Sequence, residues 1–325
     1  MDNLKLVENL GKARGLLRKE IGRIIIGQED IVEMLFMAML CSGHVLLEGV
    51  PGLAKTLIIK TLANALDLSF SRIQFTPDLM PSDITGTEII QETSAGGREF
   101  KFFKGPVFAN IILADEINRT PPKTQSALLE AMQEHSVTAA GTTYGLEEPF
   151  FVMATQNPIE QEGTYPLPEA QLDRFMFNLR ITYPPREDEV KIVNATTGSA
   201  AGDTKTVLSQ KDVIAFQDLV HQVPVAENVV QYAVDLVRNS RPGPDNKLDF
   251  IREWVQWGAG PRASQYLILG GKVRAVLDGR PTPDFADITA MIKPVMRHRI
   301  IPNFNAEAEG VDTDKILERL VQLKY

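Results

Sequence analysis

The sequence predicts an α/β domain built on a central, mostly parallel sheet of about five strands, followed by a helical domain. In the first half of the chain, short apolar segments alternate with a glycine-rich loop and with helical segments, as in a parallel sheet covered by helices. After Tyr183-Pro184-Pro185-Arg186 only helical patterns follow. The length of 325 residues also suits two domains. We therefore expect the domains at residues 1–186 and 187–325.

Five short apolar runs predict the strands of the sheet, at residues 44–48, 70–75, 110–115, 150–155 and 177–182. Helices are expected within residues 1–42, at 55–65 and at 121–133, where Thr120 suits an N-cap and Pro121 a first turn. Two segments interrupt this alternation with glycines between strand-like runs. They predict hairpins, one within about 78–103 (strands at 88–90 and 99–102) and one within about 137–146 (strands at 136–139 and 143–146).

The second half of the chain contains no further strand pattern, so we expect an all-helical domain there. Its helices are predicted at residues 211–221, with Ser209 as the N-cap, and at 226–239, 261–278, 284–292 and 313–322.

Composition limits the class of protein. The net charge is −8 and the sequence pI is about 5.2, which disfavours a general nucleic-acid binder. A single cysteine, Cys41, cannot form an internal disulfide, so a reducing compartment, the cytoplasm, is expected. No apolar run is long enough for a transmembrane helix, and no membrane partner is expected.

The strongest motif follows the first predicted strand. The run Gly49-Val50-Pro51-Gly52-Leu53-Ala54-Lys55-Thr56 matches the phosphate-binding pattern G-x-x-x-x-G-K-[ST] at every fixed position but one. Its glycines let backbone N–H groups converge on phosphate oxygens. Lys55 would reach the β- and γ-phosphates, and Thr56 would bind Mg²⁺. Ala54 replaces a glycine, and its methyl group fits if the backbone there is right-handed helical.

A second motif is an apolar strand that ends in Asp115 and Glu116. The Asp115 carboxylate would hold Mg²⁺, directly or through water, and Glu116 would polarise the attacking water. Strands often end in solvated acids, so the motif is weak alone. Its position after the phosphate loop, one helix and one more strand strengthens the interpretation.

Three polar residues complete the candidate site. Asn157 ends the next strand and could place its amide against the γ-phosphate, although a turn asparagine before proline is ordinary. Arg174 could act on a phosphate across a subunit boundary or form an ion pair with Asp173. Arg262 lies in a first helical turn, where a cation opposes the helix dipole, so it is either a nucleotide ligand or a surface arginine.

In this order, these residues resemble the AAA+ ATPases and, more narrowly, the MoxR family. The similar segments are GVPGLAKT, IILADEINR, ATQNP, PLPEAQLDRF and GPRAS, and the resemblance covers nearly the whole chain, from Gly27 to Arg299. Ala54 is what MoxR-like phosphate loops tend to show.

The resemblance implies an AAA+ core with a P-loop and a C-terminal helical lid. The hairpin at 78–103 resembles a helix-2 insert and the one at 137–146 a pre-sensor-1 hairpin. Asp115 and Glu116 match Walker B, Asn157 matches sensor 1, Arg174 the arginine finger and Arg262 sensor 2. Asn157 and Arg262 would also contact the nucleotide, together with Ile26, Gly27, Gln28, Gly49, Val50, Pro51, Gly52, Leu53, Ala54, Lys55, Thr56 and Leu57.

The family further implies a Mg²⁺-dependent ATPase that assembles into rings, usually hexamers, with ATP at subunit interfaces. Its members remodel or activate client protein complexes, including by metal-cofactor insertion, often with von Willebrand factor A-domain partners.

Three alternatives stay open. One is a nucleic-acid motor related to the minichromosome-maintenance helicases, disfavoured because residues 137–146 include no basic side chain. The others are a magnesium-chelatase-like subunit and a nucleotide-gated scaffold.

Overall fold

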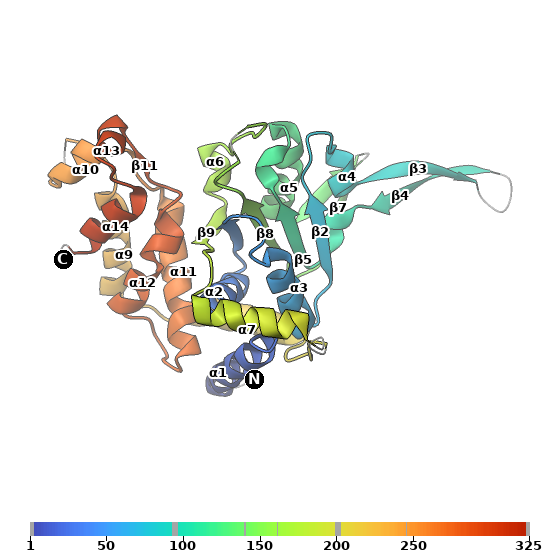
Figure 1. Cartoon of the computed structure of the whole chain (residues 1–325), viewed down its shortest axis with the longest axis horizontal. Helices are drawn as coiled ribbons and strands as arrows, with labels where there is room; N and C mark the ends of the chain where they lie inside the picture. The colour runs from blue at the N-terminus through green and yellow to red at the C-terminus, as the bar shows by residue number, and fades with distance from the viewer. Residues whose placement is uncertain are drawn as a thin grey trace.

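The computed structural model describes residues 3–92, 97–139, 141–160, 162–198, 203–244 and 246–322. An α/β domain and a helical domain lie side by side (Figure 1), with the N-terminus beneath the first and the C-terminus in the second. The α/β domain contains one five-stranded sheet, which confirms the predicted fold class.

The sheet has the strand order β2-β5-β8-β1-β9, and all neighbouring strands are parallel. In that order the strands are Phe70–Gln74, Ile111–Asp115, Phe151–Gln156, His44–Glu48 and Phe175–Arg180. β9 begins two residues before the predicted segment at 177–182, because the buried Phe175 already pairs with His44. The other strands match their predicted segments to within one residue.

Helices cover both faces of the sheet, and β5 shows how its alternating side chains serve both. Ile111 and Leu113 join the apolar core beneath α1, α2 and α3, whereas Ile112 and Ala114 join the core beneath α5. These helices span Asn3–Ile21, Glu29–Leu40, Lys55–Ala65 and Pro122–Glu134.

The predicted N-cap of α5 is wrong. The helix begins at Pro122 with Pro121 as its N-cap. Thr120 is buried, and its hydroxyl donates to the carbonyl oxygen of Ile117 at 3.5 Å instead of capping the helix. Shorter helical segments complete the domain: α4 at Pro81–Thr85, η1 at Pro106–Phe108, η2 at Ile117–Arg119 and α6 at Glu169–Leu172.

Both predicted hairpins form. β3 (Gly86–Glu92) pairs antiparallel with β4 (Arg98–Lys104), and these strands are longer than predicted. The residues expected to form their turn include 94–96, which lie outside the described residues. β6 (Ser136–Ala139) pairs with β7 (Thr142–Gly145) as the second hairpin.

The second domain is helical except for one short pair of strands. β10 (Val255–Trp257) pairs antiparallel with β11 (Ile301–Pro302), so the expectation of an entirely helical domain is wrong in this detail. Strands this short give no alternating pattern to predict them. The helices are α9 to α14, at Glu227–Asn239, Asp249–Trp254, Pro261–Leu277, Phe285–Met296, Phe304–Ala308 and Thr313–Val321.

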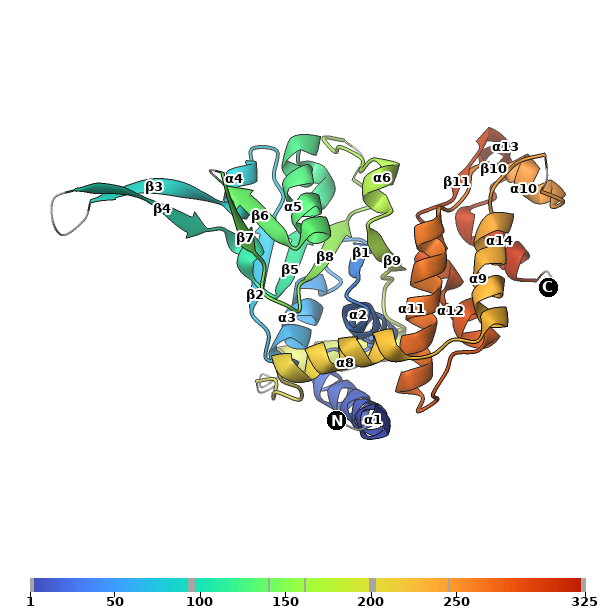
Figure 2. The same ribbon diagram turned by 180° about the vertical axis from the view of Figure 1, so that it is seen from behind.

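Two helices follow the predicted domain boundary. α7 (Arg186–Thr197) was not predicted, whereas α8 (Gln210–Gln222) begins at the predicted N-cap Ser209, whose hydroxyl accepts from the backbone N–H of Asp212. Figure 2 shows α8 across the base of the α/β domain, where it contacts α1 and α2 as well as α11. α8 therefore packs against both domains, and the boundary between residues 186 and 187 stays a prediction.

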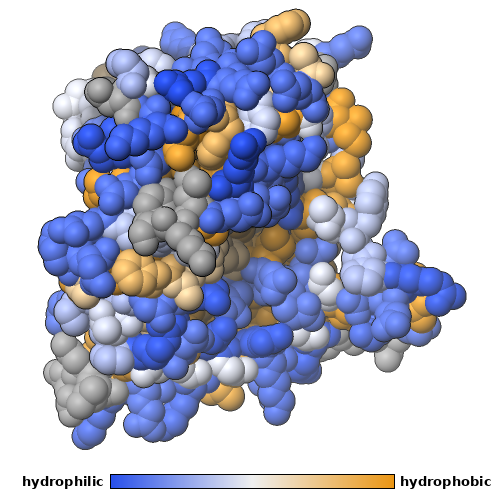
Figure 3. All heavy atoms as spheres, turned by 90° about the vertical axis from the view of Figure 1, so that its left-hand side faces the viewer, coloured by the Kyte–Doolittle hydropathy of each residue, from blue (hydrophilic) through white to orange (hydrophobic). Residues whose placement is uncertain are grey.

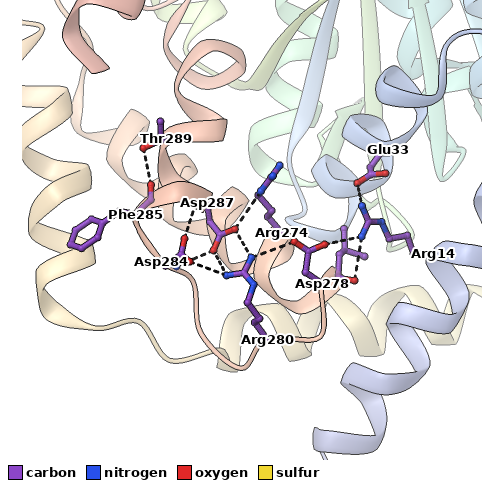
Figure 4. A network of polar contacts seen from close by, with 10 residues as sticks. Arg14, Glu33, Arg274, Asp278, Arg280, Asp284, Phe285, Asp287 and Thr289 are labelled. Carbon is purple, nitrogen blue, oxygen red and sulfur yellow. Dashed lines mark hydrogen bonds and ion pairs between the residues drawn. The ribbon is translucent and has the colours of Figure 1, made fainter. Parts of the chain in front are cut away.

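A polar network joins the two domains (Figure 4). Arg14 of α1 forms ion pairs with Glu33 of α2 and, at 2.9 Å, with Asp278 at the end of α11. Arg280 in the following loop binds the buried Asp287 of α12 at 2.6 Å. The α11–α12 turn is thus fixed to the helices beneath the sheet. The outer face of the helical domain is predominantly hydrophilic (Figure 3).

His44, the first residue of β1, connects this strand to β8 and to α5 through two hydrogen bonds. Its buried Nδ1 accepts a hydrogen bond from the Val152 backbone N–H at 3.1 Å, and its Nε2 donates to the Met132 carbonyl oxygen at 3.2 Å. Only the neutral imidazole can make both bonds. Burial lowers the pKa of His44 to about 4.

We expect the free energy of unfolding to fall by up to about 3 kcal/mol as the pH is lowered from about 6.5 to 4. In this range the unfolded chain binds a proton at His44 that the folded chain excludes. The stability is fully present above the ordinary histidine pKa and is lost toward pH 4. Urea unfolding across this range measures the slope, and His44→Gln, whose amide can replace both hydrogen bonds, should reduce it. Equal slopes for the two proteins would contradict the assignment.

Candidate functional site

An open pocket of ≈ 520 Å³ lies at the carboxyl ends of β1, β5 and β8. This edge of a parallel sheet is where ligands bind in open α/β folds. The size is that of a small-molecule site. Its lining residues are Pro51, Gly52, Leu53, Ala54, Lys55, Thr56, Leu57, Arg72, Gln74, Asp115, Glu116 and Asn157.

The loop between β1 and α3 depends on its small residues. A Cβ at Gly49 would lie 2.2 Å from Cγ2 of Ile181. Any residue other than glycine would therefore clash with Ile181 at this position. Gly52 has a φ of +87°. Ala54 has φ 54° and ψ 25°, which is left-handed, so the expected right-handed backbone is wrong. An alanine in this conformation costs roughly 1–2 kcal/mol. Ala54 is the N-cap of α3, so the chain makes this left-handed turn directly before the helix begins.

Lys55 is the first residue of α3, and its ammonium group lies within the loop. It donates a hydrogen bond to the Gly49 carbonyl oxygen. Burial lowers the pKa of Lys55, and the carboxylates of Asp115, Glu116 and Glu160 act in the opposite direction. The Lys55 side chain therefore lies at the place where a phosphate chain would lie, facing three carboxylates that favour its charged form.

Asp115 ends β5 inside a polar network. Its Oδ1 accepts from the Thr155 hydroxyl at 2.7 Å, and its Oδ2 accepts from Arg72 at 2.6 Å. The Thr155 hydroxyl oxygen also accepts from the Glu116 backbone N–H at 2.9 Å. Thr155 on β8 and Arg72 on β2 thus fix the carboxylate from two neighbouring strands.

The Glu116 carboxylate is held by one of its two oxygens. Oε2 accepts from Gln74 at 3.1 Å and pairs with Arg119 at 3.1 Å. Among the described residues, Oε1 has no such partner and is the oxygen that could take a proton from a water molecule. Arg119 also pairs with Glu160.

Asn157 follows β8 and is 7% exposed. Its Oδ1 accepts from the Ile159 backbone N–H at 3.1 Å, which fixes the orientation of the amide at the pocket wall. Hydrogen bonds from Arg119 and Asn157 lower the pKa of Glu160. Asn157 is therefore a pre-oriented neutral donor.

Arg174 and Arg262 do not line this pocket. Arg174 donates to the Leu129 carbonyl oxygen at 2.8 Å. Arg262 pairs with Asp173 at 2.8 Å, and Asp173 also pairs with the buried Arg299 at 2.7 Å. The alternative ion pair between Arg174 and Asp173 is thus not seen. Arg262 therefore lies close to Arg174, the predicted arginine finger, and not at the nucleotide pocket of its own chain.

The predicted adenine-pocket residues also lie outside the lining of this pocket. Gln28 donates to the Thr182 carbonyl oxygen at 3.1 Å, and Gly27 has a φ of +75° beside Asp188. Ile26 is half-buried. Gly49 and Val50 are not lining residues either, although the Gly49 carbonyl oxygen binds Lys55.

Three lining or supporting residues were not predicted: Arg72, Gln74 and Thr155. Their roles follow from strand register, since Gln74 pairs with Asp115 across β2 and β5. The signal was available in the alternation of Arg72 and Gln74 on a short strand, where they point to the same face.

The pocket offers Mg²⁺ a hydroxyl at Thr56 and a carboxylate at Asp115. These are hard oxygen ligands, and Mg²⁺ in phosphate sites keeps waters and phosphate oxygens for its remaining positions. Within the described ranges there is no group of three or more His, Cys, Asp or Glu that could hold a metal ion. The donor set therefore fits an ion carried with a nucleotide rather than one in an all-protein cage.

A glycine loop between a parallel strand and a helix, with a lysine, a hydroxyl and two carboxylates in one pocket, defines a P-loop nucleotide-binding site. The family model for the ATPase family associated with various cellular activities (AAA) matches residues 44–177. The model for the AAA lid domain matches residues 251–320.

The chain is 44% identical to Chaperone MoxR1 of Mycobacterium tuberculosis, over 93% of this chain and 79% of the relative. It is 42% identical to the uncharacterized protein YeaC of Bacillus subtilis, over 97% and 95%. A crystal structure of a proposed ATPase from Cytophaga hutchinsonii has a TM-score of 0.92 and 41% identity, over 99% and 97% of the chains. The chain belongs to the MoxR family of AAA+ ATPases. None of its described helices is long and apolar enough to span a bilayer.

Proposed function

We propose that the chain is a Mg²⁺-dependent ATPase that works as a ring, its nucleotide lying between neighbouring copies. The carrying observation is that Lys55, Thr56, Asp115, Glu116 and Asn157 share one pocket. In our proposal Lys55 binds the β- and γ-phosphates, Thr56 and Asp115 hold Mg²⁺, Glu116 polarises the water, and Asn157 orients it.

Arg174 and Arg262 support the ring. Both are arginines of the candidate site, and both lie outside the pocket of their own chain. They are also close together, because Arg262 forms an ion pair with Asp173, the residue before Arg174. We propose that both serve the nucleotide of a neighbouring copy, as arginine fingers do. This differs from our expectation that Arg262 acts on the same nucleotide as Lys55.

The substrate of the mechanical work is proposed to be a protein client. Chaperone MoxR1 is a chaperone by name, and the second hairpin of this chain, which has no basic residue, offers little to a phosphate backbone. Following the family resemblance, we propose a hexamer that remodels or activates a client complex in the cytoplasm. A partner with a von Willebrand factor A domain and insertion of a metal cofactor belong to the same proposal.

Specific ATPase activity is expected to rise with protein concentration until rings are complete, because no isolated copy has a full catalytic site. Steady-state turnover measured together with light scattering tests this, and chelation of Mg²⁺ with EDTA should abolish turnover at every concentration. A monomer with constant specific activity would contradict the ring, and turnover in EDTA would contradict the role of Mg²⁺.

A further inference from the structure

The first hairpin projects from the body of the protein. We call β3 (Gly86–Glu92) and β4 (Arg98–Lys104) the arm. It extends on the side of the sheet opposite the helical domain in both views (Figures 1 and 2). Its root is fixed by an aromatic contact, because the Phe102 ring stacks on Tyr144 of β7 with 4.4 Å between centroids and 14° between planes. The two hairpins are therefore connected, while the outer part of the arm stands free of the body.

The outer arm exposes large apolar side chains. Ile90 and Phe100 face each other across the two strands and are 58% and 72% exposed, and Ile89 and Phe103 are each 44% exposed. A two-stranded ribbon is marginally stable in water by itself. Within the described residues each strand also keeps one unpaired edge, which is a template for another strand. The exposed apolar side chains and the unpaired edges of the arm therefore indicate a surface that binds another polypeptide.

Charge is divided between the two strands of the arm. β3 carries the acids Glu88 and Glu92 and no basic residue, whereas β4 carries Arg98, Lys101 and Lys104 against the single acid Glu99. Neither Glu88 nor Glu92 forms an ion pair in the described part of the chain. Edges that carry the same charge would repel each other, but here an acidic edge and a basic edge attract.

We propose that arms of neighbouring copies pair edge to edge, with β4 of one copy against β3 of the next. The partner is a second copy of this chain, and the interface rests on the ring proposed above. In the proposed ring the arms run along the rotation axis, the one direction that rotation leaves unchanged. β4 of one copy and β3 of the next then run antiparallel and extend the ribbon as a meander. A register like that within the arm puts Arg98 beside Glu92 of the next copy.

The charge division favours this partner over a client polypeptide. A head-to-tail contact joins two different surfaces of one chain and can close into a ring, which needs two complementary edges on each copy. The arm has such a pair of edges. A client that added a strand would need only one unpaired edge and would gain nothing from opposite charges on the two.

The test uses two charge-reversal variants, Glu92→Arg and Arg98→Glu, in the full chain with ATP. Each alone places like charges at every junction between arms, so we expect ring assembly to require at least about tenfold more protein than the wild-type chain. An equal mixture restores opposite charges between alternating copies, and assembly should return toward the wild-type concentration. Within each arm the mixture changes nothing, so a defect inside the hairpin would not be rescued. Sedimentation velocity measures the ring fraction.

Lys12→Glu is the matched control, since it reverses an exposed charge on α1, away from the arm, and should assemble like the wild type. Normal assembly of both single variants, or defects that mixing does not rescue, would overturn the pairing and leave the arm to a client polypeptide. Nucleotide binding by each variant is measured in parallel. If the wild-type chain binds ATP but forms no ring, the proposed ring fails and the arm pairing fails with it.

Discussion

Replacing Glu116 with glutamine is expected to lower ATP turnover by at least about a hundredfold while leaving nucleotide binding close to that of the wild-type chain. The amide keeps the size of the side chain, and its oxygen can still accept from Gln74 and Arg119, as Oε2 of Glu116 does. It cannot accept a proton from the attacking water. The loss therefore falls on the chemical step.

Single-turnover hydrolysis and titration with a fluorescent ATP analogue separate the two effects. Glu130→Gln, an exposed glutamate on α5 that does not line the pocket, is the control and should change neither quantity. Turnover at the wild-type rate in Glu116→Gln would show that another group activates the water, and weakened binding would mean that Glu116 positions the nucleotide instead.

Replacing Asp173 with alanine is expected to lower the free energy of unfolding by about 3 kcal/mol, because it leaves a buried cation without its partner. The side chain of Arg299 is 2% exposed, and burial lowers the pKa of its guanidinium group. Arg299 also donates to the carbonyl oxygens of Asp173 and Phe175, at 2.8 and 2.7 Å, so it cannot turn toward water. Arg262, at 40% exposure, can become solvated and contributes little to this cost.

Urea unfolding with a far-UV signal measures the change for Asp173→Ala. The control is Asp249→Ala, which removes an acid that is 87% exposed and pairs with Arg252, and it should cost less than about 0.5 kcal/mol. Similar small changes for both variants would mean that the buried Arg299 does not depend on Asp173.

The secondary structure that could be predicted is the part with strong local patterns. α3 and β1 were predicted at their observed bounds because a glycine loop separates an apolar strand from a helix. α7 was missed because none of its residues is buried, so it has no apolar face to create a period.

The candidate site divides in the same way. Lys55, Thr56, Asp115 and Glu116 could be predicted because each belongs to a contiguous motif. Thr155 could not, because its role depends on β8 lying beside β5. The partner of Arg262 depends on how the helical domain sits on α6, which no local pattern of sequence encodes.

We propose that Arg174 of a neighbouring copy completes each nucleotide pocket, and a mixture of two inactive variants can show whether it does. Lys55→Ala removes the phosphate-binding lysine but keeps the arginine, and Arg174→Ala does the reverse. An arginine finger contributes on the order of 10³ or more to turnover, so an equal mixture should exceed either variant alone by at least about tenfold. A mixture no more active than the sum of its parts, with both variants present in mixed rings, would show that Arg174 does not act on the nucleotide of a neighbouring copy.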